Sequence, residues 1–379
     1  MILRLDLLKE LTESIENNPI TAILGPRQCG KTTLTKHIQH DLFTVHYFDL
    51  EDPRDQLFFE NPMLALENLD GIIVIDEIQL KPSLFTVLRV LSDSKQHNTR
   101  FVILGSASPS LIKGASESLA GRIHFIDMTG FSLKEVGKEG LEKLWMRGGF
   151  PRSFLAVSES KSILWRTNFI RTFLERDIPQ LGINIPTERI RKFWYMLAHY
   201  HGNILNASEL GKSLNLTSHT IQYYLEILSG TYMIELQQPW HENISKRQVK
   251  SPKLFIRDTG LLHTLLGMNE KQIATHPKIG ASWEGFVIEQ LKNKFPHDEL
   301  YFWNTHGGAE LDVLILKGGK RYGIEIKYSD TPTLSRGSYI AVEDLKLDLL
   351  YVIVPNSRTY ALKNKVIVSS LTDFIALEF

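Results

Sequence analysis

Ile23-Leu24-Gly25-Pro26-Arg27-Gln28-Cys29-Gly30-Lys31-Thr32-Thr33 is the most informative segment of the chain. The apolar residues before Gly25 indicate the end of a buried strand, and the residues after Thr32 are compatible with a helix. A strand, a loop of the pattern G-x-x-x-x-G-K-T and a helix together form a phosphate-binding loop. Its glycines let backbone N–H groups turn towards a phosphate, and the helix N-terminus adds partial positive charge. We expect residues 25–33 to bind a nucleotide, with the Lys31 ammonium on its outer phosphates and the Thr32 hydroxyl on Mg²⁺.

A second segment, Gly71-Ile72-Ile73-Val74-Ile75-Asp76-Glu77, supplies acidic residues for the same site. Its β-branched run predicts a strand buried on both faces, as in a parallel sheet, and two carboxylates follow at its carboxyl end. Ligands bind at that edge of parallel sheets. We expect Asp76 to help hold Mg²⁺, and Glu77 to orient or activate the water that attacks the γ-phosphate. The alternative is a strand with a solvated acidic end.

Further strands are predicted over residues 43–49, 100–105 and 123–128. Ser106 follows the strand 100–105, where a polar side chain can hydrogen-bond the γ-phosphate or the attacking water. Serine after a strand also serves as a helix cap or turn former, so both roles stay open.

Arg122 directly precedes the last of these strands. From there an arginine can reach the γ-phosphate of a neighbouring subunit and stabilise charge in the transition state, as an arginine finger does. A salt bridge within its own subunit is the competing role.

Composition describes an ordinary globular chain of two or three domains. The 379 residues are 43% apolar and 23% charged, and 43 basic residues balance 43 acidic ones. Net charge therefore indicates no partner, and DNA binding would need a local basic surface. No apolar run approaches the roughly 18 residues of a membrane span, so we expect a cytosolic protein without membrane contact. The single cysteine, Cys29, is interpreted either as a reactive thiol of the phosphate loop or as an inert filler.

The core residues resemble those of AAA-type P-loop ATPases. The phosphate loop is followed in order by Ile75-Asp76-Glu77-Ile78-Gln79, Gly105-Ser106-Ala107-Ser108 and Leu119-Ala120-Gly121-Arg122. This order is similar to a large prokaryotic group of AAA-type ATPases whose carboxyl half is a domain of unknown function related to restriction endonucleases. The resemblance runs from Ile20 to about Lys327. It implies an α/β fold with a P-loop parallel sheet core over residues 1–130, and an ATPase more than any particular substrate.

Residues 131–190 read as a helical lid over the nucleotide. The segment Asn168-Phe169-Ile170-Arg171-Thr172-Phe173-Leu174-Glu175-Arg176-Asp177-Ile178 predicts a helix rich in paired charges. Arg171 or Arg176 can sense nucleotide across a boundary between domains or subunits. Surface ion pairing is the alternative for each of them.

A winged helix-turn-helix is predicted over residues 191–257, with its helices at 207–214 and 219–229. The hairpin that follows the second helix carries a run of basic residues, which fits a wing that contacts phosphates: Lys246, Arg247, Lys250, Lys253 and Arg257. The second helix presents no Arg or Lys outward, which weakens sequence-specific reading of DNA. DNA contact and a purely architectural role both stay open.

Residues 258–379 resemble the PD-(D/E)xK nuclease pattern. A helix bears Glu284, the strand 310–316 places Asp312 beside the core, and the next strand presents Glu325 and Lys327 on one face. In that pattern the carboxylates of Glu284, Asp312 and Glu325 hold Mg²⁺, and Lys327 positions or activates the attacking water. The segment Glu310-Leu311-Asp312 stands where Pro-Asp is usual.

Together these features predict a cytosolic, Mg²⁺-dependent AAA-type ATPase that assembles into a homo-oligomer. The carboxyl domain would then bind or cleave DNA under the control of ATP. The alternative is a signalling or scaffold ATPase, in which the winged helix and the nuclease-like fold act only as binding and lid modules.

Overall fold

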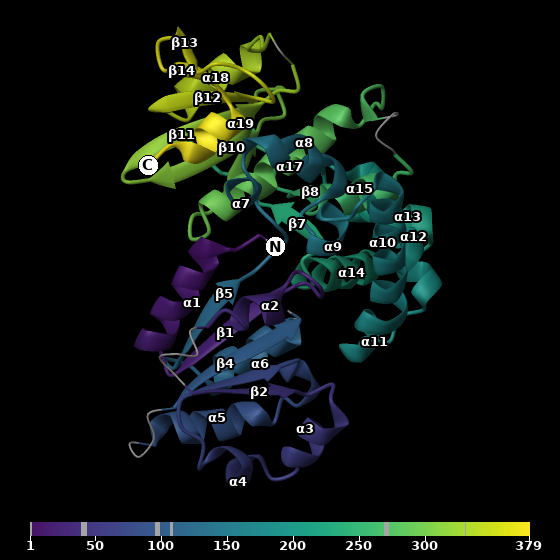
Figure 1. Cartoon of the computed structure of the whole chain (residues 1–379). Coiled ribbons are helices and arrows are strands. Elements are labelled where there is room, and N and C mark those ends of the chain that lie inside the picture. The colour runs from purple at the N-terminus through teal and green to yellow at the C-terminus, as the bar shows by residue number, and fades with distance from the viewer. Residues whose placement is uncertain (1, 39–43, 95–98, 107–108, 269–272, 330) are drawn as a thin grey trace. The chain divides into compact units, whose positions relative to one another are not determined.

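The computed structural model describes residues 2–38, 44–94, 99–106, 109–268, 273–329 and 331–379 (Figure 1). The chain forms two units. Unit 1 comprises Met1–Gly130 and Glu226–Tyr232, and unit 2 comprises Phe131–Leu225 and Met233–Phe379. The helix α14 (Ser218–Gly230) thus contributes residues to both.

Unit 1 is built on a parallel five-stranded sheet of order β2-β3-β4-β1-β5. The strands are β1 (Ile20–Gly25), β2 (Val45–Asp49), β3 (Ile72–Asp76), β4 (Arg100–Ser106) and β5 (Ile123–Asp127). The parallel sheet expected from the β-branched runs is confirmed. All five strands point the same way, so the loop after β1 and the acidic end of β3 lie at one edge of the sheet.

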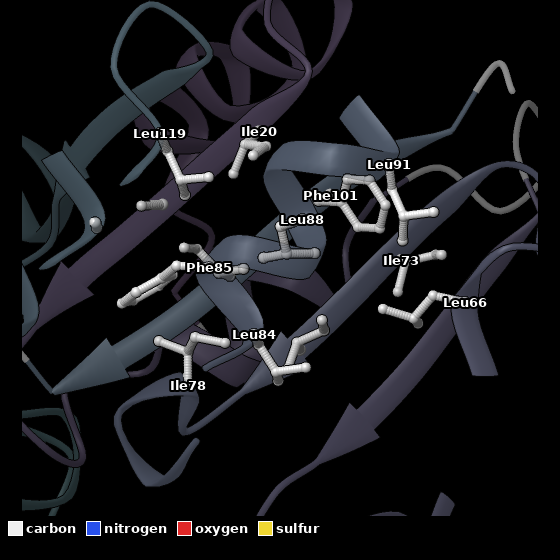
Figure 2. Packing of buried hydrophobic residues seen from close by; sticks show 14 of the residues in the cluster. Ile20, Leu66, Ile73, Ile78, Leu84, Phe85, Leu88, Leu91, Phe101 and Leu119 are labelled. Atoms are coloured by element: carbon white, nitrogen blue, oxygen red, sulfur yellow. The ribbon is translucent and has the colours of Figure 1, made fainter. Parts of the chain in front are cut away.

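Side chains alternate between two apolar cores because successive residues of a strand point to opposite faces. Ile73 and Ile75 of β3 enter one core, whereas Ile72 and Val74 enter the other. In the first core, Leu84, Leu88 and Leu91 line one side of helix α5 (Leu84–Asp93) and pack towards Phe101 of β4 (Figure 2). A sheet covered on both faces explains why its strands read as continuous apolar runs.

The remaining helices of unit 1 precede the first strand or connect the strands. They are α1 (Leu5–Asn17), α2 (Lys31–Thr35), α3 (Pro53–Phe58), α4 (Pro62–Leu66), a 3-10 helix (Ile78–Leu80) and α6 (Pro109–Ser118). Helix α1 buries Leu11 and Ile15 in the second core, together with Ile23 of β1. Helix α1 is therefore amphipathic, with its buried side in this core.

Unit 2 begins with helices and lacks strands before residue 203 in its described part. These helices are α7 (Leu133–Val136), α8 (Leu141–Arg147), α9 (Pro151–Phe154), α10 (Glu159–Thr172), α11 (Ile178–Gln180) and α12 (Thr187–Tyr200). The helix expected over 168–178 is interrupted, because Phe173–Asp177 forms a π-helical turn between α10 and α11. A π-helical turn inserts one residue per turn and so changes which side chains face the core.

Helix α13 (Ala207–Leu214) and α14 are separated by a turn in which Asn215 has φ 55°. A three-stranded antiparallel sheet accompanies them, in the order β6 (Asn203–Ile204), β8 (Lys253–Ile256) and β7 (Ile234–Gln237). These are the elements that a winged helix requires, and that assignment stays a prediction.

The last part of unit 2 holds a mixed six-stranded sheet of order β13-β14-β12-β11-β10-β9. Its strands are β9 (Tyr301–Asn304), β10 (Glu310–Lys317), β11 (Lys320–Ile326), β12 (Leu349–Val354), β13 (Tyr360–Lys363) and β14 (Val366–Ser370). The associated helices are α15 (Thr259–Leu265), α17 (Ile279–Lys294), α18 (Arg336–Asp344) and α19 (Leu371–Ala376). Strands β10 and β11 form the expected hairpin, because Gly318 and Gly319 supply positive φ values of 58° and 75° at the turn.

Candidate nucleotide site and acidic cluster

The loop between β1 and α2 wraps around the side chain of Lys31. The Lys31 Nζ donates to the carbonyl oxygens of Gly25 at 3.0 Å and Pro26 at 2.9 Å, and the residue is only 6% exposed. Gln28 (φ 63°) and Gly30 (φ 105°) adopt the left-handed conformation that turns the loop. The ammonium is therefore held inside the loop that the sequence predicts for phosphate.

Gly25 is a position in the phosphate loop where only glycine fits. A Cβ atom built there would lie 1.9 Å from the carbonyl oxygen of Met128, at the end of β5. The backbone of the loop and the backbone after β5 thus approach each other too closely for any side chain. Cys29 packs beside them, fully buried, with its Sγ 3.4 Å from the same oxygen. Its thiol has no access to solvent in this structure, which favours the filler over the reactive thiol.

Thr32 and Asp76 meet directly at the edge of the sheet. The Thr32 hydroxyl donates to Oδ2 of Asp76 at 2.6 Å, and Oδ1 of Asp76 accepts from the backbone N–H of Glu77 at 2.9 Å. Magnesium sites of this class use one or two protein oxygen ligands and complete their shell with phosphate and water. The hydroxyl and carboxylate oxygens present here fit such a site.

Glu77 is held beside the loop by neighbours of both signs. It adopts φ 56°, its carboxylate accepts from the side-chain amide of Gln79, and Arg27 lies 3.7 Å away. Burial raises the pKa of Glu77 above its ordinary value, while the positive charge of Arg27 opposes that rise. Arg27 also pairs with Glu51. The geometry is that of a carboxylate whose basicity is increased by its surroundings.

Ser106 ends β4 opposite Gly25 in the register of the sheet. Its backbone N–H donates to the side-chain oxygen of Gln79 at 3.3 Å, and its buried hydroxyl has no hydrogen-bond partner within the described structure. Gln79 therefore links the end of β4 to Glu77. Sequence reasoning assigned Gln79 no role, although it follows Glu77 by two positions. Ala107 and Ser108 of the same segment lie outside the described residues.

Arg122 lies away from the phosphate loop of its own chain. It precedes β5, whereas the loop follows β1, and these two strands run parallel. Its guanidinium forms two hydrogen bonds with Asp93, at 2.6 and 2.8 Å. The intrasubunit salt bridge is therefore present, and the finger role towards a neighbour stays a prediction. In unit 2, Arg171 pairs with Glu175 at 3.0 Å on the surface, which is the ion-pair alternative.

A second set of charged residues meets in unit 2. The ammonium of Lys253, on β8, lies 2.6 Å from Glu310, 3.2 Å from Glu284 and 3.8 Å from Asp312. We call these four residues the acidic cluster. Helix α17 supplies Glu284 and strand β10 supplies Glu310 and Asp312.

Glu325 and Lys327 lie next to this cluster. Their side chains form an ion pair at 2.7 Å, and Asp312 accepts from the backbone N–H of Ile326 at 2.8 Å. Burial raises the pKa of Glu284 to about 7, and burial together with the charge of Asp312 raises that of Glu325 to about 7. The structure thus brings together the residues expected from the nuclease-like pattern.

The structure differs from that expectation in one respect. Across the described residues, no three Asp, Glu, His or Cys side chains converge in a way that could hold a metal ion. Whether Glu284, Asp312 and Glu325 hold a metal ion stays a prediction. The ammonium of Lys253 already lies near two of these carboxylates, those of Glu284 at 3.2 Å and Asp312 at 3.8 Å.

The five basic residues predicted for the wing lie in different environments. Lys253 is buried in the acidic cluster, Arg257 pairs with Glu289 at 2.9 Å, and Lys246 pairs with Asp344 at 2.5 Å. Only Arg247 and Lys250 of the five predicted cations are exposed without an ion pair in the described structure. The wing carries far less free positive charge than its sequence suggests.

Three segments of the chain match known families. Residues 17–137 match the family described as AAA domain, 138–272 a domain of unknown function (DUF8612), and 279–374 a domain of unknown function (DUF4143). Over 368 residues the chain is 44% identical to the uncharacterized proteins Rv2008c of Mycobacterium tuberculosis and Mb2031c of Mycobacterium bovis. That match spans 97% of this chain and 83% of each relative. The chain belongs to the family of these mycobacterial proteins.

A solved structure shares the fold of this family member. The Walker-type ATPase PABY2304 of Pyrococcus abyssi aligns with a TM-score of 0.52 and 16% identity, over 70% of this chain and 96% of its own. The AAA match and the parallel sheet together identify residues 17–137 as a P-loop AAA-type ATPase domain. No helix in the described part of the chain is both long and apolar enough to cross a membrane.

Proposed function

We propose that this AAA-type domain hydrolyses ATP with Mg²⁺ held by Thr32 and Asp76. The observation that carries the proposal is the 2.6 Å contact between the Thr32 hydroxyl and the Asp76 carboxylate, one residue away from Lys31. These oxygens and the Lys31 ammonium meet at the edge of the sheet where such folds bind their ligands.

Each residue of the site has a role in this proposal. Lys31 exchanges the carbonyl oxygens of its loop for phosphate oxygens, which are stronger acceptors because they are charged. Glu77, fixed by Gln79, orients the attacking water and accepts its proton. Ser106 offers its unpartnered hydroxyl to the γ-phosphate or the water. When bound, Mg²⁺ neutralises charge on the phosphates.

Replacing Thr32 by alanine tests the metal site. We expect the Mg²⁺ concentration for half-maximal ATP hydrolysis to rise and turnover to fall by about tenfold or more, because one oxygen ligand is lost. Phosphate release at fixed ATP, measured against Mg²⁺ concentration, gives both values. Thr12→Ala is a matched control, because Thr12 is an exposed threonine of α1. An unchanged Mg²⁺ dependence in Thr32→Ala would contradict the proposal.

Replacing Arg27 by glutamine tests the environment of Glu77. The loss of the nearby positive charge is expected to raise the pKa of Glu77 further. Glu77 acts as the carboxylate, so activity is lost as pH falls through its pKa. The acidic limb of the profile of kcat/KM against pH should therefore move to higher pH in Arg27→Gln. Arg54→Gln, which removes an exposed arginine paired with Asp52, should leave the limb in place. A limb that stays fixed in both variants would remove Glu77 from this role.

A second proposal concerns what ATP hydrolysis controls in the rest of the chain. A nucleotide-controlled binding or scaffold protein is favoured over a DNA nuclease by the position of Lys253 between the carboxylates that would hold metal. Whether that cluster binds a divalent cation distinguishes the two functions. Self-assembly, the finger role of Arg122 and contact with DNA stay predictions from the sequence.

A further inference from the structure

The position of Lys253 is unusual for a lysine. Lys253 begins β8, its side chain is only 5% exposed, and its neighbours on that strand are apolar and buried. Lysine is rarely fully buried unless it is paired, because its charge is costly to remove from water. A paired partner must therefore be present, and the chain supplies three acidic ones.

The three acidic partners surround the ammonium from two elements. Nζ makes hydrogen bonds to Glu310 at 2.6 Å and Glu284 at 3.2 Å, with Asp312 at 3.8 Å. The ring of Phe302 lies 5.5 Å from the same nitrogen. The ammonium is thus enclosed by carboxylates and an aromatic ring, in the way that a bound cation is enclosed.

Lys253 keeps its positive charge although it is buried. Burial alone would lower the pKa of the ammonium, but the negative charges of Glu284, Asp312 and Glu310 outweigh it and hold the pKa above its usual value. Lys253 therefore remains positive at neutral pH. It neutralises part of the negative charge that would attract a divalent cation, and it repels any cation that approaches the same carboxylates.

We propose that Lys253 occupies the place of a divalent cation in the acidic cluster, so that this part of the chain binds no catalytic metal. The cluster is instead an internal ion pair network that joins β8 to α17 and β10. A water activated by metal is then not available beside Glu325 and Lys327. The inference is independent of ATP hydrolysis in unit 1.

Binding of Mn²⁺ to the nucleotide-free full-length chain tests the proposal. Free Mn²⁺ is measured by its electron paramagnetic resonance signal, and thermal unfolding is followed in parallel. The variants are Lys253→Met, which removes the ammonium and keeps an unbranched side chain one atom shorter, and the same change combined with Glu284→Gln. Lys246→Met is the matched control, because Lys246 is a lysine in an exposed ion pair with Asp344.

We expect no Mn²⁺ binding by wild type that depends on the cluster. Lys253→Met should gain a site, and its unfolding temperature should rise by about 5 °C when Mn²⁺ exceeds its dissociation constant a hundredfold. Both gains should disappear when Glu284→Gln is added, and Lys246→Met should behave as wild type. Any weak Mn²⁺ binding at Asp76 would be the same in every variant, so it does not affect the differences between them.

Two results would overturn the proposal. One is Mn²⁺ binding by wild type that is lost in the single variants Glu284→Gln and Asp312→Asn. The other is a folded Lys253→Met that gains no site. If Lys253→Met fails to fold, the wild-type chain and those two single variants decide the outcome alone.

Discussion

Glu77→Gln is expected to lower ATP turnover by about 10²–10⁴-fold while ATP still binds, because glutamine keeps the size of the side chain but cannot accept a proton. Glu77 is held beside the loop by Gln79 and lies 3.7 Å from Arg27, so the amide should occupy the same place. Steady-state phosphate release gives turnover, and titration with a fluorescent ATP analogue gives affinity.

Two other variants serve as comparisons for Glu77→Gln. Lys31→Ala should weaken ATP binding itself, because the ammonium for the outer phosphates is removed. Glu60→Gln, at an exposed glutamate of unit 1, should match wild type. If turnover in Glu77→Gln stays within about tenfold of wild type, Glu77 is not the residue that activates water.

The second large effect is expected for Arg166→Met, which should reduce the free energy of unfolding of unit 2 by about 3–5 kcal/mol. Arg166 is 1% exposed, and its guanidinium donates to Glu159 at 2.8 Å and to the carbonyl oxygens of Gly260 at 2.9 Å and Met146 at 3.2 Å. It thereby joins α10 to residues within α8 and α15. Methionine fills most of the volume but leaves the carbonyl oxygens of Gly260 and Met146 without this donor, and Glu159 keeps only its pair with Arg147 at 2.9 Å.

Tryptophan fluorescence isolates this effect. The chain has 6 tryptophans, and all of them lie in unit 2: Trp145, Trp165, Trp194, Trp240, Trp283 and Trp303. Urea unfolding followed by their emission therefore reports the unit that contains Arg166. Arg171→Ala is the control on the same helix, because Arg171 is 69% exposed and its pair with Glu175 should contribute less than about 1 kcal/mol. Equal shifts in both variants would contradict the buried network.

Patterns of adjacent residues were sufficient to predict the loop and the strands of the nucleotide site. The glycine pattern of residues 25–33 predicts the loop, and β-branched runs such as Ile72–Val74 predict strands buried on both faces. The Gly318-Gly319 pair likewise predicts the turn between β10 and β11. Each of these features depends on residues adjacent in sequence, because backbone conformation and side-chain periodicity are local properties.

Residues far apart in the chain were predicted less well. Gln79 was assigned no role because nothing in its own segment shows that Ser106 lies beside it. The π-helical turn at Phe173–Asp177 was missed because the charge pattern of a helix does not reveal an extra residue in one turn. Arg166 was assigned no role, since its acceptors come from residues as distant as Gly260.

The sequence by itself determined the phosphate loop, the acidic strand end and the residue types of the nuclease-like pattern. Only the tertiary structure decided which charged side chains lie next to one another. Lys253 reads as one basic residue of a wing, yet β8 pairs with β7 in a register that places it beside Glu310 and Asp312. The energy of an ion depends on which charges surround it and on how much water remains, and both are set by the packing of distant elements.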